Sequence, residues 1–206
     1  MSEDNIINHI EKLLRELIKC NSQYKLYKLL LEKTNSNLKE LNLAPAFFQL
    51  VIDSLSSNVI LTLAKIYEQP KRSGGSIYKL LNKIEQNWKE INNEQINSCR
   101  INQHREVIKQ MNEIIDNLFE WRDKHYAHYD KDYFVGEKNI SDDYKITFGN
   151  IEQLIDKAKE ILNYYYSALT GKYMCCEATN FDDINRIINI LKEHNICIQD
   201  FLNTRK

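Results

Sequence analysis

The chain has 206 residues, with 28 Lys and Arg, 29 Asp and Glu, and a formal net charge of −1. This length suits one domain with its own core. The balanced charge excludes a global basic surface that would hold nucleic acid without sequence preference. Only two prolines and five glycines occur, so the composition favours long helices over strands.

The cysteines and the N-terminus point to a cytoplasmic protein. The five cysteines are odd in number and match no zinc-ligand spacing: Cys20, Cys99, Cys175, Cys176 and Cys197. The adjacent pair is a redox candidate, and the simpler interpretation is two partly buried thiols in a reducing compartment. The first residues lack the basic segment of a signal peptide. We find no run of about 18 apolar residues, so we expect no membrane span and no membrane partner.

The first half of the chain predicts two long helices. The first begins at Ser2, an N-cap residue, and runs to about Leu41 with a possible break at Asn21-Ser22. The second begins at Pro45, ends near Tyr67 and is the most apolar, so we expect it to be the central, most buried helix. Gln69 to Ser76 is the clearest loop, and Ser76 caps a short helix after it.

The second half predicts one very long helix, a polar loop and a closing helix. Apolar residues at helical spacing indicate a helix from about Asn93 to Tyr126. Residues 130–147 are polar and predict a loop. Thr147 or Asn150 caps the next helix, which ends at Gly171, a typical residue after a helix C-terminus.

A last helix is expected from about Asn180 to His194, and the tail from Ile196 is left unassigned. These elements predict an all-α protein, a bundle of five to six helices in a single domain. Residues 1–171 would form the bundle, and residues 172–206 would add a C-terminal helix and tail packed on the same domain.

The stretch FEWRDKHYAHYDKDYF, residues 119–134, carries the groups most suited to chemistry. Arg122 falls four residues after Leu118 and seven after Ile115, and therefore lies on an apolar stripe. A charge there is costly unless it is paired or faces a cleft or interface. His125 and His128 follow closely, and histidine is the side chain that titrates near neutral pH.

Arginine and histidine together suit phosphodiester chemistry. The guanidinium presents a planar fork to phosphate oxygens, and an imidazole can take a proton from a ribose 2′-hydroxyl or give one to the leaving oxygen. Neither group needs a metal, so no cofactor is expected. One such pair is little for a full acid–base cycle, and two chains related by a two-fold axis would supply two.

Arg122, five further residues and then His128 match the Arg-x(4–6)-His signature of the HEPN superfamily. The string RDKHYAHYD resembles the abortive-infection AbiU-type branch of that superfamily. The earlier segments AFFQLVIDSLSSNVILTLAKIYEQ and SIYKLL are also similar to it. The resemblance spans about residues 40 to 170.

The resemblance implies a dimeric helical bundle that acts as a metal-independent ribonuclease in phage defence or as a toxin. RNA, not DNA, would be the substrate, and an antitoxin or other defence protein would be a partner. Arg122 and His128 would be the catalytic pair, with Asp123 orienting them. Weaker substrate-binding roles fall to His125, Tyr129, Asp130 and Tyr133. Asp130 stands where some toxin members carry a tyrosine that a partner enzyme modifies, so this sequence departs from them there.

Structural alternatives stay open for the same residues. Arg122 could pair with a buried carboxylate such as Asp53 or with its own loop, and His128 could cap a helix C-terminus. His125, His128 and Asp130 are metal-ligand types, but their spacing does not place all three on one helical face. Near-neutral charge favours a rival function, a non-catalytic helical interaction module of a defence system.

Overall fold

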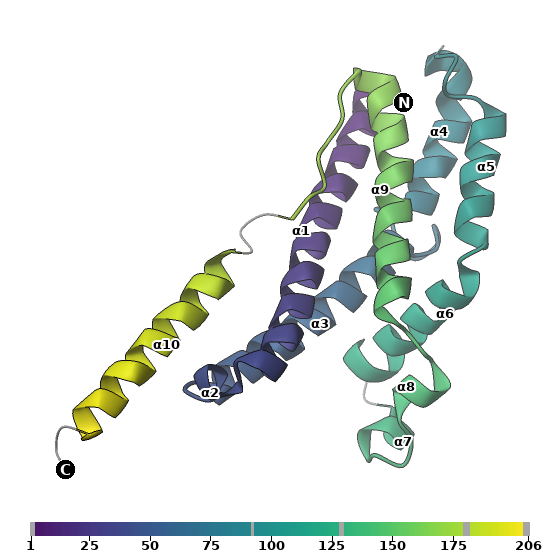
Figure 1. Ribbon diagram of the computed structural model, residues 1–206. Coiled ribbons are helices and arrows are strands. Elements are labelled where there is room, and N and C mark those ends of the chain that lie inside the picture. Colours follow the sequence, from purple (N-terminus) through teal and green to yellow (C-terminus); the bar gives the residue numbers. More distant parts are fainter. Residues whose placement is uncertain (1–2, 92, 128–129, 179–181, 204–206) are drawn as a thin grey trace.

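The computed structural model describes residues 3–91, 93–127, 130–178 and 182–203. Throughout these ranges the regular structure is helical and no strand occurs, as predicted. Figure 1 shows long helices side by side, with a last helix that leans away from the others.

Helix α1 (Glu3–Ser36) is the longest element and packs on α3 (Pro45–Ile66) and α9 (Phe148–Thr170). The possible break at Asn21-Ser22 is absent, and both side chains form hydrogen bonds within the continuous helix or across to a neighbouring segment. Asn21 donates to the carbonyl of Cys176 at 2.7 Å, and Ser22 donates to the carbonyl of Ile18, one turn earlier, at 2.9 Å.

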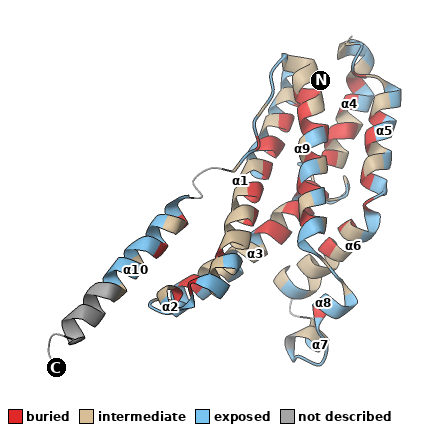
Figure 2. Ribbon diagram, viewed as in Figure 1, coloured by how far each residue is buried: buried red, intermediate tan, exposed pale blue. Residues whose placement is uncertain are grey.

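One large apolar core lies between α1, the C-terminal half of α3, α4 (Ile77–Ile91), α5 (Ser98–Lys109), α6 (Asn112–Trp121) and α9. Figure 2 shows buried residues along the facing sides of these helices. The loop expected between α3 and α4 is present. Helix α9 is capped by Thr147 and Asn150 together and ends at Gly171 with φ 67°, both as the sequence predicts.

Helix α3 has the predicted bounds but not the predicted burial. Its C-terminal half is in the core, whereas Phe47 and Leu50 are 59% and 66% exposed. By length and composition α3 could cross a membrane, and the expectation that no segment spans one stays a prediction. The core helix of a soluble protein passes the same test, and the part of α3 from Val59 to Ile66 lies in the core. The N-terminal half packs on α1 with one face only, where Phe48 is 5% exposed and lies in an apolar cluster with Leu30 of α1.

The single helix expected from Asn93 to Tyr126 is divided into three elements. Helix α5 ends at Lys109, where the N–H of Met111 bonds to the carbonyl of Ile108, only three residues back. Helix α6 follows, and at Arg122 it changes to a π-helical turn, η1 (Arg122–Ala127). The predicted loop 130–147 contains the short helices α7 (Lys131–Phe134) and α8 (Ile140–Asp143), begun by the N-caps Asp130 and Asn139.

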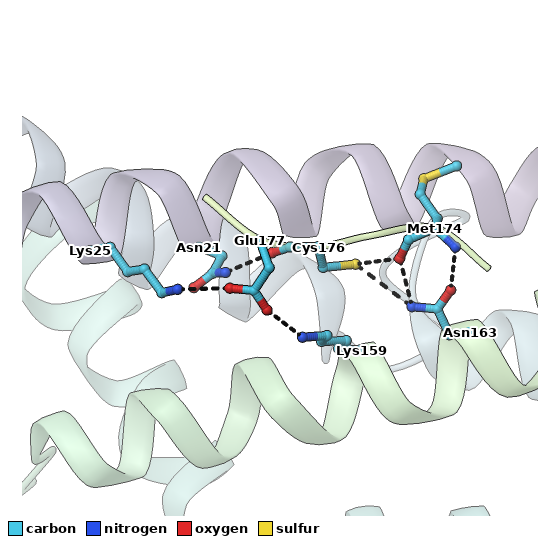
Figure 3. Close-up of polar contacts among 7 residues, drawn as sticks. All are labelled: Asn21, Lys25, Lys159, Asn163, Met174, Cys176 and Glu177. Carbon is cyan, nitrogen blue, oxygen red and sulfur yellow. Dashed lines mark hydrogen bonds and ion pairs between the residues drawn. The ribbon is translucent and has the colours of Figure 1, made fainter. Parts of the chain in front are cut away.

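The extended segment 172–177 lies between α1 and α9 and is held by side chains from both (Figure 3). The buried Asn163 donates to the carbonyl of Met174 at 3.1 Å and accepts from its N–H at 2.9 Å. Lys25 and Lys159 each contact the Glu177 carboxylate at 3.0 Å. These bonds fix the point from which the chain leaves the bundle.

Helix α10 (Asp182–Asn203) runs further than predicted and touches the bundle at one end. Its buried Ile184 and Ile188 form a second, smaller apolar cluster with residues of α1, α3 and α2 (Leu38–Leu41). Assignment of residues 172–206 to the same domain stays a prediction.

Replacing Asn163 should destabilise the protein, because Asn163→Ala leaves the N–H of Met174 without its acceptor and the carbonyl of Met174 with only the Cys176 thiol as a donor. The expected loss in the free energy of unfolding is about 1–3 kcal/mol, measured by urea denaturation. Asn189→Ala, at an exposed site on α10, should change it by less than about 0.5 kcal/mol. Equal effects of the two substitutions would contradict the anchoring role of Asn163.

The ion pairs of Glu177 should make stability depend on pH. Lys159 and Lys25 lower the pKa of Glu177 from 4.5 to about 2. A depressed carboxyl pKa stabilises the folded state above pH 4.5, and that contribution is lost as the pH falls towards 2. The thermal midpoint of Glu177→Gln should therefore lie below that of the wild type at pH 7 and converge with it near pH 2. A difference that is constant over this range would contradict the assignment.

Candidate functional site

The turn η1 continues α6 and carries three of the residues singled out in the sequence, Arg122, Asp123 and His125. A π-helical turn is wider than an α-helical one, and such turns are frequent at functional sites. Its Lys124 carbonyl accepts a bond from the N–H of Asp130 at 3.3 Å, so the chain beyond the turn folds back on it. Contacts between η1 and α3 hold the turn against the bundle.

Arg122 opens the turn, and its guanidinium is bound by two carboxylates. Its Nε donates to Asp123 Oδ1 at 2.6 Å and its Nη2 donates to Asp123 Oδ2 at 3.0 Å. Its Nη1 donates to the Glu68 carboxylate, which follows the end of α3. The group also lies over the Phe119 ring, 4.8 Å from its centroid. With only 14% of its side chain exposed, Arg122 is both paired and largely sheltered from water.

The two carboxylates explain how the charged Arg122 can lie on the apolar stripe of α6. Ile115 and Leu118 are buried as predicted, and the charge of Arg122 is tolerated beside them because two acidic side chains offset it. The bonds from Asp123 and Glu68 raise the pKa of Arg122 above its already high value. The alternative pairing with Asp53 is wrong: Asp53 instead accepts a hydrogen bond from Gln49 on its own helix.

Glu68 is the functional candidate that sequence reasoning missed. The one available signal was its position, an acidic residue directly after the most apolar helix. Nothing in the spacing of the chain connects it to Arg122, which lies 54 residues later. The contact arises because the end of α3 and the end of α6 meet in the bundle.

The other half of the predicted catalytic pair, His128, lies outside the described residues, as does Tyr129. His125 is exposed, with its ring 5.5 Å from the Trp121 ring and 4.7 Å from the Tyr126 ring. Exposure leaves it available to a ligand, and no polar contact ties it to Arg122 among the described side chains.

Asp130 and Tyr133, predicted as weak substrate contacts, have structural partners. Asp130 caps α7 by accepting from the N–H of Asp132 at 3.1 Å. The Tyr133 hydroxyl donates to Asp143 at 2.8 Å, and this bond raises the tyrosine pKa to about 12. Both residues help to shape the segment that follows η1.

Lys124 is a second residue that the sequence did not single out. Its ammonium donates to the Tyr144 hydroxyl at 2.6 Å and lies 2.9 Å from a Glu120 oxygen. It also stands over the Tyr144 ring, 4.4 Å from the centroid. These contacts tie η1 to the segment before α9.

Within the described residues, no group of three or more His, Cys, Asp or Glu side chains is placed to hold a metal ion.

Comparison with known proteins places this geometry in a family context. The family model described as AbiU2, of the HEPN type, matches residues 3–187 and therefore includes the whole bundle and the start of α10. No curated protein and no solved structure matches the chain significantly.

Removing Glu68 should destabilise the fold, because the largely buried charge of Arg122 then loses one of its two carboxylate partners. Glu68→Ala leaves Arg122 with Asp123 alone, and we expect a loss of about 1–3 kcal/mol in the free energy of unfolding. The matched control is Glu160→Ala, which removes the exposed ion pair to Lys157 and should cost less than about 1 kcal/mol. Chemical denaturation at neutral pH measures both. A loss for Glu68→Ala no larger than that of the control would show that the pairing contributes little.

Proposed function

The chain belongs to the AbiU2 branch of the HEPN superfamily, and on that premise we propose that it is a metal-independent endoribonuclease of a defence or toxin system. The observation that carries the proposal is the position of Arg122. The family signature begins at this residue, which stands at the head of a π-helical turn with its guanidinium held in one orientation by Asp123 and Glu68. A preorganised positive group is what a phosphoryl transition state requires.

In the proposed reaction His128 acts as the proton carrier. An imidazole takes the proton of the 2′-hydroxyl, the 2′-oxygen attacks the adjacent phosphorus, and the bond from phosphorus to the 5′-oxygen breaks. The leaving oxygen takes up a proton, which gives a 2′,3′-cyclic phosphate and a free 5′-hydroxyl. Arg122 stabilises the charge on the phosphate, and Asp123 fixes the guanidinium.

The carboxylates of Glu68 and Asp123 set a condition on this chemistry. These carboxylates already accept hydrogen bonds from all three nitrogens of the Arg122 guanidinium, so a substrate phosphate must compete with them for its N–H groups. We propose a homodimer in which two such sites meet, because a second Arg and His would complete the acid–base cycle. An antitoxin or other defence protein would be the cytoplasmic partner.

A second function is favoured by the same pairing. If Glu68 and Asp123 keep the guanidinium occupied, Arg122 is a structural residue and the protein is a non-catalytic interaction module. The exposed apolar residues of α3, Phe47 and Leu50, would suit such a module. The two functions differ in whether the purified chain cleaves RNA and whether that cleavage requires Arg122.

The direct test is cleavage of total RNA and tRNA by the purified chain with EDTA present. Wild type should cleave and leave 2′,3′-cyclic phosphate ends, while His128→Ala should be slower by roughly a hundred- to ten-thousandfold, the usual contribution of a general acid or base. Arg122→Ala should also lose activity.

Matched controls for this test are Arg100→Ala, which removes an arginine stacked on Tyr164, and His194→Ala, at an exposed site on α10. Both should cleave like the wild type, and circular dichroism should show every variant folded. Full activity in folded His128→Ala would remove the ribonuclease proposal. Inactivity of all the proteins on every RNA would favour the interaction module.

A further inference from the structure

Beside η1 the bundle contains a cavity of about 370 Å³. It lies where α1, α3, η1 and the start of α9 meet. Ligand sites for small molecules have volumes of about 300–1,000 Å³, so this cavity can hold a single ring system.

Aromatic rings form much of its wall: Tyr27 from α1, Trp121 and Tyr126 from the end of α6 and η1, and Phe148 from α9. The rings lie in pairs. The centroids of Trp121 and Tyr126 are 6.1 Å apart with an angle of 30° between the planes, and those of Tyr27 and Phe148 are 6.0 Å apart. Such rings offer flat surfaces to a planar aromatic ligand.

Hydrogen bonds hold two of these rings in place before any ligand arrives. Trp121 Nε1 donates to the carbonyl of Tyr144 at 2.6 Å. The hydroxyls of Tyr126 and Ser56 are 3.2 Å apart and bond to each other. A site whose rings are already oriented loses little side-chain freedom when it binds a ligand.

The polarity of the cavity selects a neutral ligand with a hydrogen-bonding edge. None of the described residues that line it carries a formal charge, and its floor includes the apolar Val59 and Ile60. The hydroxyls of Tyr27, Ser56 and Tyr126 belong to the same lining and can each donate or accept. A phosphate would find no cation here, whereas a nucleobase matches both the flat apolar walls and the polar groups.

We propose that this cavity binds a nucleobase of single-stranded RNA, an inference that rests on the ribonuclease function proposed above. Arg122 bonds to Glu68 beyond the end of α3, whereas Tyr126 bonds to Ser56, which lies ten residues before that end at Ile66. At 1.5 Å per residue, Ser56 and Ile66 are about 15 Å apart along α3, and Glu68 lies beyond Ile66. The bound base therefore belongs to a nucleotide that flanks the cleaved bond, and the cavity recognises sequence next to it.

The fluorescence of Trp121 tests the proposal without requiring RNA cleavage. In a Trp88→Phe background Trp121 is the only tryptophan of the chain. Titration with AMP, GMP, CMP and UMP should quench it saturably for at least one nucleotide, and ribose 5-phosphate, which has no base, should not. Quenching by ribose 5-phosphate as strong as that by the nucleotides would overturn the proposal.

Substitutions at Tyr27 locate the binding. Tyr27→Leu removes one ring and its hydroxyl and should weaken binding roughly tenfold, the usual worth of one base-stacking contact. Tyr27→Phe keeps the ring and should weaken binding by about two- to tenfold, which also serves if the leucine variant does not fold. Tyr173→Leu, at an exposed tyrosine outside the cavity, is the matched control and should bind like the parent.

The outcomes separate this proposal from the ribonuclease itself. Absence of quenching by every nucleotide, or equal affinity in the parent and both Tyr27 variants, overturns the nucleobase site even if RNA is cleaved. Quenching that depends on Tyr27 supports the nucleobase site, including the case in which the same protein cleaves no RNA. In that case only the proposed catalysis fails.

Discussion

The apolar stripe of α1 is the constraint on which the rest of the bundle depends. Its buried residues from Ile6 to Tyr24 face α3 on one side and α9 on the other, so these two helices are fixed through it as well as by their own contacts. The segment 172–177 then lies in the groove between α1 and α9, with Asn21 and Asn163 satisfying its backbone.

The cost of placing charge beside this core explains the arrangement at η1. Arg122 follows two buried residues on the stripe of α6, and its guanidinium is accommodated because Asp123 and Glu68 both reach it. The same pairing that makes the arginine tolerable also orients it. The structural role of Arg122 and its proposed catalytic role thus rest on one set of bonds, and substitution of Glu68 probes both.

The turn η1 has two faces that suit two parts of one ligand. Near its start, Arg122 offers a charged fork that a phosphate could share with the carboxylates. Near its end, Tyr126 joins Trp121, Tyr27 and Ser56 around a cavity without charged lining among the described residues. A polynucleotide alternates charged phosphates and flat neutral bases in the same way, and single-stranded recognition generally combines cationic and aromatic surfaces.

The sequence by itself determined the helical class, the bounds of α3 and α9, the caps at Thr147 and Gly171, and the position of Arg122 on an apolar stripe. These features depend on residues within a few turns of one another, and local propensity and periodicity express them. Only the tertiary structure decided that Glu68 pairs with Arg122, that Phe47 and Leu50 of α3 are exposed, and that four aromatic rings meet at one cavity. The reason is that burial and pairing depend on which helices pack together, and residues as far apart as Tyr27 and Phe148 carry no local sign that they will meet.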